Sequence, residues 1–481
     1  MFKNYKEFKE YADENGILIV DFKEVDMAGR WHHLSVPIEY FTEELLSKGI
    51  GFDGSSYGFL SVEKSDMVFI PDLSSAFFDP LVEMPTVTMI GDIYKITGNG
   101  YERFQNDPRY IADKAEQFLK KSGISDECLF GPEFEFYLLD NIEFRNEINH
   151  IEVHIDSAQA GWNTINSPHD EQSRNAGYKI LHHKGYHADI PHDTTYDLRN
   201  IMIRTLEENG IPVKYHHHEN GGPGQVEIEV KSATVREMAD RTQKIKYFIK
   251  NLAIQYGKSA TFMPKPFKTE CGSGMHIHIQ MNKDGKPIFY DENGYSKLSK
   301  TALSAIAGIL KHSDSLLAFT NPTTNSYKRL VPGYEAPVTV CFGNANRSSV
   351  IRIPGYAMSP NEKRFEFRPS DATCNPYLAY SAMVMAMIDG IKNNLDPTEL
   401  HFGPYDKNMY SLSEEEKKYI RALPKSLSEA ADALESDNDY LLDGGVFTKE
   451  IIEGQLKKIR SDALEISLIP HPVEFEMYYD L

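Results

Sequence analysis

Four segments of the chain alternate strictly between apolar and polar residues. The clearest is GPEFEFYLLD, in which Phe134 separates Glu133 from Glu135. Because side chains two positions apart in a strand point to the same side, both carboxylates face one way and the phenyl rings face the other. The same period occurs in QVEIEV, HIHIQ and RFEFRP, whose charged or imidazole positions are Glu227, Glu229, His276, His278, Arg364, Glu366 and Arg368. The pattern predicts four strands, each with one apolar and one charged face.

The remaining pattern divides the chain into two parts. Residues 1–104 hold one N-terminal helical pattern and several strand patterns, which predict a small β-rich domain. Asp107 followed by Pro108 is typical of a helix cap and a first-turn proline, so a second domain, 105–481, is expected to begin just before them. Its strands are irregularly spaced among long helices, and no Gly-rich dinucleotide or P-loop motif occurs. This favours an α+β fold with a mainly antiparallel sheet over a doubly wound fold.

Composition and charge narrow the possible functions. The 481 residues include 51 Lys and Arg against 71 Asp and Glu, a net charge of −20. A surface this acidic does not suit nucleic-acid binding. No apolar run approaches the roughly 18 residues of a membrane span, and the N-terminus has no signal-peptide pattern, so no membrane partner is expected. The four cysteines are far apart and form no CxxC motif, which favours a cytoplasmic location.

The charged strand faces indicate a metal centre. One such strand is typical of a half-exposed sheet. Four strands whose outward residues are almost purely Glu, His and Arg need another explanation, because neighbouring carboxylates repel unless a cation lies among them. Carboxylates with one imidazole favour Mg²⁺ or Mn²⁺ over zinc, and the number of glutamates implies two ions. Nearby arginines favour chemistry on nucleotide phosphates, although a two-metal phosphohydrolase is an alternative from these residues alone.

Longer motifs resemble those of the glutamine synthetase family in its bacterial class I form. FDGSS and EKSDM resemble the N-terminal signature, and GPEFEF and HHHENGGPGQVEIE resemble the two metal-binding segments. KPFKTECGSGMHIH resembles the ATP-region signature, NPTTNSYKRLVPGYEAPV resembles the glutamate-binding stretch, and NRSSVIRIP and RFEFRPSDATCNPYLA complete the set. The resemblance covers nearly the whole chain. It implies a β-grasp-like domain over 1–104 and a catalytic domain with a curved, mainly antiparallel sheet over 105–481.

The resemblance implies a reaction and its metal ions. The reaction is ATP-dependent ligation of ammonia to L-glutamate through a γ-glutamyl phosphate, giving L-glutamine, ADP and phosphate. Two or three Mg²⁺ or Mn²⁺ ions are implied. The positions that match the ligands of one ion are Glu135, Glu219 and Glu227, and those that match a second ion, nearer the nucleotide phosphates, are Glu133, His276 and Glu366. Glu229 lies outside the matched set and is expected to be structural.

Other positions match contacts to substrates. The implied ATP-binding residues are His278, Arg347 and Arg352, and the implied substrate-binding residues are Gly272, Arg329, Glu335 and Arg368. Arg329 matches the arginine that holds the α-carboxylate of glutamate, since its planar fork suits carboxylates. The implied catalytic residues are Asp53, which matches the group that binds ammonium and takes its proton, Glu335, which matches a loop residue that closes over the site, Arg347 and Arg368.

The resemblance also implies an assembly. In the family, the loop that holds the residue matching Asp53 reaches a neighbouring subunit. This implies a homododecamer of two stacked hexameric rings, with active sites between subunits. Tyr410 matches a position that is adenylylated in some members of the family.

Three departures bear on the choice of substrate. Cys271, Gln280 and Lys214 stand where the family usually has Asn, Ser and, often, Glu. They leave open a ligase that joins glutamate to a larger amine such as a polyamine, and a synthetase-like assembly or regulatory protein without catalysis. The retained Asp53 favours ammonia, and the retained metal-ligand and arginine positions favour catalysis.

Overall fold

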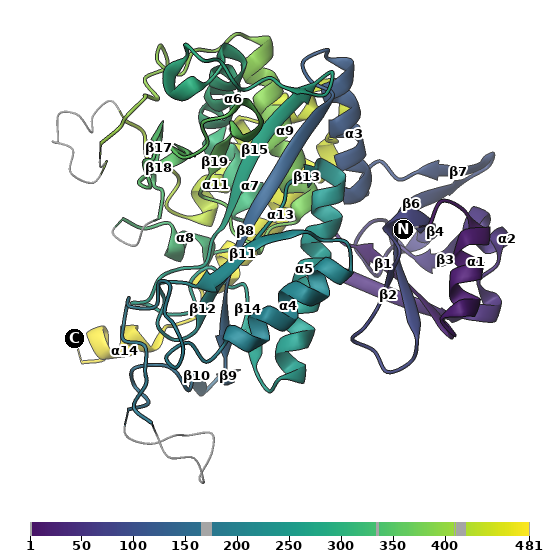
Figure 1. Cartoon of the computed structure of the whole chain (residues 1–481), viewed down its shortest axis with the longest axis horizontal. Helices are drawn as coiled ribbons and strands as arrows, with labels where there is room; N and C mark the ends of the chain where they lie inside the picture. The colour runs from purple at the N-terminus through teal and green to yellow at the C-terminus, as the bar shows by residue number, and fades with distance from the viewer. Residues whose placement is uncertain (1, 165–175, 333–335, 408, 410–419, 481) are drawn as a thin grey trace.

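The computed structural model describes residues 2–164, 176–332, 336–407, 409 and 420–480. Figure 1 shows the N-terminal strands as a small group beside a larger body that holds most of the helices. Within these ranges, no helix is long and apolar enough to cross a membrane.

The smaller sheet belongs to the N-terminal part. Its seven strands run in the order β2-β1-β6-β4-β3, with β5 and β7 also paired to β6. Their bounds are β1 Ile19–Val25, β2 Trp31–Pro37, β3 Ile50–Asp53, β4 Asp66–Pro71, β5 Phe77–Phe78, β6 Thr86–Thr97 and β7 Gly100–Arg103. β1 and β6 are parallel. Helices α1 (Tyr5–Glu14) and α2 (Glu43–Lys48) contribute Phe8 and Leu45 to the apolar core of this part.

The larger sheet has ten strands in the order β11-β12-β8-β15-β19-β18-β17, with β13 and β14 paired to β8 and β16 paired to β15. Their bounds are β8 Glu127–Leu139, β11 Val213–His218, β12 Gln225–Val230, β13 Ala233–Thr234, β14 Ser259–Thr261, β15 Met275–Lys283, β16 Lys286–Pro287, β17 Thr339–Asn344, β18 Ser349–Ile353 and β19 Phe365–Phe367. The pairings are antiparallel except β17 with β18, which confirms the predicted α+β class. The four alternating segments lie in β12, β8, β15 and β19, which are consecutive neighbours.

Helices pack around the larger sheet. They are α3 Pro108–Lys121, α4 Tyr196–Glu208, α5 Val235–Gln255, α6 Lys300–Lys311, α7 Ser313–Thr320, α8 Ser326–Arg329, α9 Pro376–Lys392, α11 Leu427–Ser436, α12 Asp439–Leu442, α13 Lys449–Ser467 and α14 Pro472–Tyr478. Short 3-10 helices span Ile38–Tyr40, Val62–Lys64, Leu73–Ser75, Tyr295–Lys297, Pro360–Glu362 and Asp443–Gly445. Helix α3 begins as predicted, because the Asp107 carboxylate accepts a hydrogen bond from the Arg109 N–H at 3.0 Å and Pro108 is the first residue.

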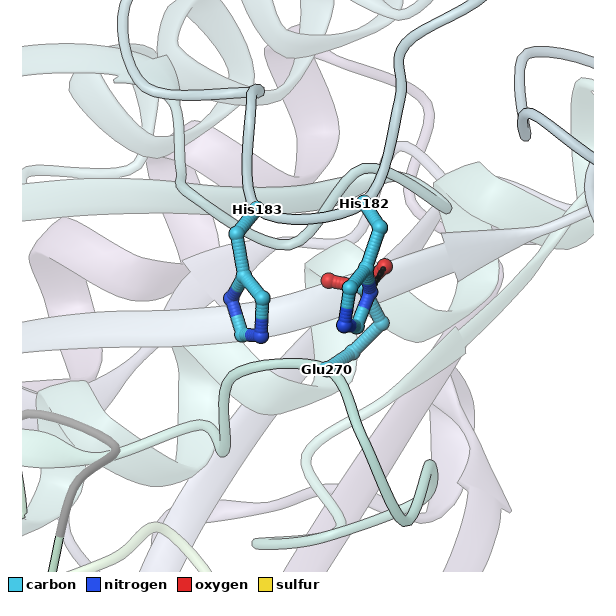
Figure 2. Close-up of side chains that lie close together, drawn as sticks. All are labelled: His182, His183 and Glu270. Carbon is cyan, nitrogen blue, oxygen red and sulfur yellow. Dashed lines mark hydrogen bonds and ion pairs between the residues drawn. The ribbon is translucent and has the colours of Figure 1, made fainter.

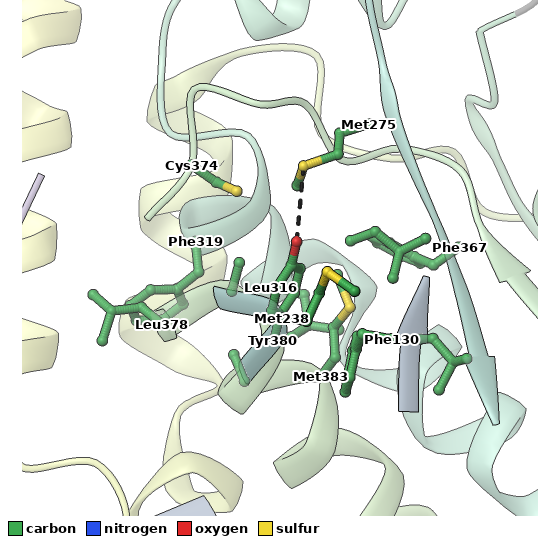
Figure 3. Packing of buried hydrophobic residues seen from close by; sticks show 14 of the residues in the cluster. Phe130, Met238, Met275, Leu316, Phe319, Phe367, Cys374, Leu378, Tyr380 and Met383 are labelled. Atoms are coloured by element: carbon green, nitrogen blue, oxygen red, sulfur yellow. Dashed lines mark hydrogen bonds between the residues drawn. The ribbon is translucent and has the colours of Figure 1, made fainter. Parts of the chain in front are cut away.

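The apolar faces of the charged strands hold the sheet against the helices. Figure 3 shows Phe130 of β8, Met275 of β15 and Phe367 of β19 beside Tyr380 and Met383 of α9. The Tyr380 hydroxyl donates to the Met275 sulfur at 3.9 Å. Because this side of the sheet is occupied by the core, the charged side chains of the same strands must point to the opposite side.

Two peripheral elements expose apolar side chains. Strands β9 (Asn141–Glu147) and β10 (His150–Asp156) form a separate two-stranded sheet. Phe144 and Val153 are exposed on it, and Phe475 and Met477 are exposed on α14 near the C-terminus.

Candidate active site

Strand register brings the predicted acidic residues to one face of the larger sheet. On one side of β8, Glu227 of β12 lies opposite Glu135, and Glu229 lies opposite Glu133. On the other side of β8, His276 of β15 lies opposite Glu133. Side chains that are paired across neighbouring strands share a face, so the strand period and the register together gather these groups.

The same face continues across the next two strands. His278 of β15 lies opposite Glu366 of β19, and Glu366 lies opposite Arg352 of β18. Glu366 is fully buried, and its carboxylate makes ion pairs with Arg352, at 2.5 Å, and with Arg368. Arg352 and Arg368 therefore place positive charge beside the acidic face, next to β18 and β19.

A cavity of about 350 Å³ opens over this face. Carboxylates, imidazoles and guanidinium groups line most of it. Among the lining residues are Glu133, Glu135, Glu219, Glu227, Glu229, His217, His276, Lys214, Cys271, Gly272, Arg329, Arg347, Arg352, Arg364 and Arg368. The cavity thus has an acidic floor and several arginines, which suits a polyanionic ligand bound together with cations.

One predicted set of metal ligands is compact. Donor atoms of Glu133, His276 and Glu366 all lie within 4.8 Å of one another. His276 Nδ1 is 3.1 Å from Glu133 Oε2 and 3.8 Å from Glu366 Oε1. Glu133 also contacts His278, whose Nε2 is 2.8 Å from Glu133 Oε1.

The three residues of the second predicted set line the same cavity, but they do not form a single compact cluster with one another. Glu219 and Glu227 form a cluster with His217, again with donor atoms within 4.8 Å of one another. The third member of the set, Glu135, instead contacts His276 of the first cluster and the backbone of Gly274. Its Oε1 lies 3.7 Å from His276 Nδ1, and its Oε2 accepts the Gly274 N–H at 2.6 Å.

Arg329 is held rigidly at the edge of the cavity. It is 5% exposed, its Nη1 donates to the Pro369 carbonyl at 2.6 Å, and its Nη2 lies 3.3 Å from His276 Nε2. A Cβ at Gly274 would lie 2.3 Å from Arg329 Nη2, and a Cβ at Gly272 would lie 2.7 Å from Arg329 Cγ. Both positions therefore need glycine for Arg329 to occupy its place.

Comparison with known proteins decides the family. The family model of the glutamine synthetase catalytic domain matches residues 105–478, and that of the glutamine synthetase β-grasp domain matches 16–96. The chain belongs to the glutamine synthetase family. It is 45% identical over 478 residues to a glutamine synthetase of Aquifex aeolicus, with 99% of both chains covered. This confirms the resemblance of the motifs and the expected β-grasp and catalytic architecture.

Solved structures agree. A Plasmodium falciparum glutamine synthetase superposes with a TM-score of 0.89 at 29% identity, covering 99% of both chains. A structure described as a GmaS/ADP complex superposes with a TM-score of 0.79 at 26% identity, covering 98% of this chain and 99% of the other.

Two predicted site residues, Asp53 and His278, do not line the cavity. Asp53 ends β3 in the N-terminal sheet and does not line it. Hydrogen bonds from Ser55 and Ser56 lower the pKa of Asp53 to about 2, so this exposed carboxylate is ionised near neutral pH. Glu335 lies outside the described residues, as does Tyr410.

The carboxylates of the cavity differ in the direction in which their pKa values are shifted. Burial, together with repulsion from Glu135 and Glu227, raises the pKa of Glu219 to about 8. Burial and repulsion from neighbouring glutamates such as Glu133 also raise the pKa of Glu227 well above its usual range. Burial would raise the pKa of Glu366 too, but the positive groups of Arg368, His278 and Arg352 together outweigh it, and the pKa falls to about 2.

This arrangement fits the ATP and divalent metal ions that the family implies. The donor set is carboxylate oxygen with imidazole nitrogen, which suits Mg²⁺ or Mn²⁺. The raised pKa values of Glu219 and Glu227 indicate that these groups lack a compensating positive charge.

Two residues of the cavity, His217 and Glu229, were not among the predicted metal ligands. His217 groups with Glu219 and Glu227. Glu229 forms a third cluster with Glu133 and His278, and it makes an ion pair with Lys214. The alternation in QVEIEV placed Glu229 on the correct face, whereas His217 lies on β11, which the hydrophobic pattern did not predict. Of the other departures, Cys271 lines the cavity, and Gln280 donates a hydrogen bond at 3.4 Å to the Asn361 carbonyl.

Proposed function

We propose that the protein ligates ammonia to L-glutamate at the expense of ATP and releases L-glutamine, ADP and phosphate. One observation carries the proposal. In a member of the glutamine synthetase family, strands β11, β12, β8, β15 and β19, together with Glu219 just after β11, direct two carboxylate and imidazole clusters into one cavity that also contains several arginines.

The reaction has two steps. An oxygen of the γ-carboxylate of glutamate attacks the terminal phosphorus of ATP, and the bond to ADP breaks to leave a γ-glutamyl phosphate. The nitrogen of ammonia then attacks the acyl carbon, the bond to phosphate breaks, and the nitrogen loses a proton. We assign Arg347 and Arg368 to the charge that develops on the transferred phosphoryl group, and His278, Arg347 and Arg352 to ATP.

The metal ligands are assigned by matching the motifs, and the clusters support the assignment. Glu133, His276 and Glu366 would hold one ion, and Glu135, Glu219 and Glu227 would hold another, with His217 close enough to contribute. Two or three Mg²⁺ or Mn²⁺ ions bound there would neutralise the nucleotide phosphates. Glu229 and Lys214, which pair with each other, would position the neighbouring His278.

Glutamate is assigned to the arginine side of the cavity. Arg329 would bind its α-carboxylate, with Gly272 and Arg368 as further contacts. The Gly272 carbonyl accepts a hydrogen bond from Gln225 Nε2 at 3.0 Å, which fixes the backbone next to Arg329. Glu335 would close over this substrate and exclude water from the acyl phosphate.

Ammonium is assigned to Asp53 of a neighbouring subunit. The low pKa of Asp53 keeps its carboxylate anionic near neutral pH, the charge state that ammonium binding needs. Asp53 does not line the cavity of its own chain, which supports sites shared between subunits. The exposed Phe144, Val153, Phe475 and Met477 supply apolar surface for subunit contacts, and we propose a homododecamer of two hexameric rings.

Two further proposals concern organisation. The matched family models support a division into domains 1–104 and 105–481. The four cysteines are buried and far apart in the sequence, which supports a cytoplasmic location.

The test is ADP release with glutamate, Mg²⁺ or Mn²⁺, and either ammonia, methylamine or a polyamine as acceptor. Ammonia is expected to give the highest kcat/KM. Preference for a larger amine would favour the related amine ligase, which Cys271 on the cavity wall brings into consideration. Assembled protein that turns over no acceptor would contradict a catalytic function.

A further inference from the structure

A second group of metal-ligating side chains lies beside the cavity. His182 and His183 come from the loop between β10 and α4, and Glu270 and Cys271 come from the loop between β14 and β15. Figure 2 shows both imidazoles pointing from their own loop toward the loop that carries Glu270. The proposed reaction uses neither histidine nor Glu270.

The four side chains form a chain of contacts from Glu270 through His182 and His183 to Cys271. His182 Nδ1 lies 2.5 Å from Glu270 Oε1, and His183 Nδ1 lies 3.2 Å from Cys271 Sγ. The two imidazole rings are 4.0 Å apart between centroids. One donor atom from each of His182, His183 and Glu270 lies within 4.8 Å of the other two.

Glu270 gives an independent sign of a missing ligand. Its side chain is 6% exposed, and while Oε1 contacts His182, Oε2 is buried without a hydrogen-bond partner among the described residues. A buried carboxylate oxygen without a donor is costly, and a bound cation is one way to satisfy it.

We propose that His182, His183, Glu270 and Cys271 form a binding site for a zinc-type transition-metal ion, separate from the carboxylate-rich centre of the cavity. Imidazole nitrogen, thiolate sulfur and carboxylate oxygen are all zinc ligands, and four of them make the coordination number of a closed zinc site. Sulfur and nitrogen donors select Zn²⁺ over Mg²⁺, whereas the oxygen-rich centre suits Mg²⁺ or Mn²⁺. The two sites therefore differ in the chemical class of ion that they take.

The site can close on an ion with small movements. A tetrahedral zinc holds its donor atoms about 3.3–3.8 Å apart. The donors of His182, His183 and Glu270, which lie within 4.8 Å of one another, must therefore approach by about 1 Å, while Cys271 Sγ is already 3.2 Å from His183 Nδ1. The His182 side chain is 52% exposed and can make this adjustment, and its exposure also gives the ion a path from solvent. The opposite loop is firmly held, because Lys265 donates to the Glu270 carbonyl at 2.5 Å and Tyr137 donates to the Cys271 carbonyl at 2.6 Å.

An ion bound at the proposed zinc site should alter glutamate binding in the cavity. Cys271 and Gly272 line it beside Arg329, so an ion that fixes the Cys271 side chain changes the wall against which glutamate is proposed to bind. We expect the KM for glutamate to change several-fold when zinc binds. This consequence depends on the proposed function, whereas binding of the ion does not.

The experiment measures metal binding by the intact assembly. Equilibrium dialysis against Zn²⁺ in excess Mg²⁺ is performed on the wild type, His182→Ala, His183→Ala and the more conservative His182→Gln. Because Zn²⁺ also competes for the oxygen-rich centre, the decisive quantity is the difference between wild type and variant, expected to be one ion per chain. His150→Ala is the matched control, since His150 forms an exposed pair with Glu152 at 2.8 Å. It should bind as much zinc as the wild type.

Cobalt substitution provides a second readout that does not require activity. Co²⁺ bound at this site should show a thiolate-to-metal charge-transfer absorption, which Cys271→Ser should abolish. Equal zinc binding by wild type and both correctly assembled His182 variants would overturn the proposal, as would a cobalt–thiolate band that persists in Cys271→Ser. A protein that binds the ion but forms no glutamine would refute the proposed function and leave this site standing.

Discussion

At the residue scale, the site depends on two glycines, whose lack of a Cβ leaves room for a charged side chain. The glycines at 272 and 274 leave the space in which Arg329 lies, and the Gly274 N–H also binds Glu135 at 2.6 Å. Gly274 has no left-handed backbone angle, so the requirement there is steric: a Cβ would meet the Arg329 guanidinium group first, at 2.3 Å, and His276 Nε2 next, at 3.1 Å.

Gly274→Ala should therefore displace Arg329 without altering any charge. We expect the KM for glutamate to rise about 10- to 100-fold, the loss equivalent to a hydrogen bond to a charged group, while the KM for ATP changes little. Steady-state kinetics with each substrate varied in turn measures both. Gly355→Ala is the control, because a Cβ there would meet its nearest neighbour at an ordinary 3.6 Å. Equal effects of the two substitutions would contradict the steric argument.

At the element scale, a buried histidine joins three helices. His312 follows α6, its Nε2 contacts Asp389 of α9 at 2.9 Å, and its Nδ1 contacts Asp437 at the end of α11 at 2.9 Å. Burial opposes protonation, but the hydrogen bonds to the two carboxylates outweigh it and raise the pKa of His312. Protonated His312 therefore stabilises the packing of these helices.

The sign of the pH dependence follows. Because the folded pKa of His312 is raised above the ordinary 6.5, its contribution to stability is fully present below pH 6.5 and is lost as the pH rises through the folded pKa. His312→Gln should lower the free energy of unfolding by about 1–3 kcal/mol at low pH, and by less at high pH. Thermal unfolding across pH measures this difference. His150→Gln, in the exposed pair with Glu152, should leave the profile unchanged, and a pH-independent effect of His312→Gln would contradict the assignment.

At the scale of the whole molecule, the proposed catalytic group Asp53 lies apart from the cavity of its own chain. The cavity is lined by residues of the larger sheet, whereas Asp53 ends β3. Figure 1 shows β3 in the small N-terminal group of strands beside the larger body. The acidic floor of the cavity is also incomplete without cations, as the raised pKa of Glu219 indicates.

Subunit mixing tests the shared site. Chains with Asp53→Ala and chains with Arg329→Ala should each be inactive alone. When the two are co-assembled, about a quarter of the sites would combine an intact Asp53 with an intact Arg329, and activity should return to that level. Mixed assemblies that stay inactive, although each variant assembles normally, would place Asp53 outside the neighbouring site.

Metal removal tests the acidic floor. Chelation should lower the melting temperature, and Mg²⁺ or Mn²⁺ at 100 times its dissociation constant should restore about 2.7 kcal/mol of stability for each site. Differential scanning calorimetry at fixed ionic strength measures it, with Na⁺ as the control for screening. Glu227→Gln should reduce the metal-dependent gain, and a gain of the same size with Na⁺ would contradict specific binding.

Local pattern predicted the strands of the active site well. Period-two alternation identified the faces of β8, β12, β15 and β19, because a strand has only two faces and the apolar one had to be buried. The helix cap at Asp107 was likewise predicted from neighbouring residues alone. The parallel pairs β1–β6 and β17–β18, the β9–β10 hairpin and strand β11 were not predicted, because their pairing depends on partners that are distant or mainly polar.

The sequence by itself determined which side chains share a face and, through its motifs, the family to which the chain belongs. Only the tertiary structure decided that β12, β8, β15 and β19 are neighbours, that His217 joins Glu219 and Glu227, and that Asp53 lies apart from the cavity. The physical reason is that the geometry of a single strand fixes the side to which each of its side chains points. Which strands become neighbours depends instead on pairing and packing between segments far apart in the chain.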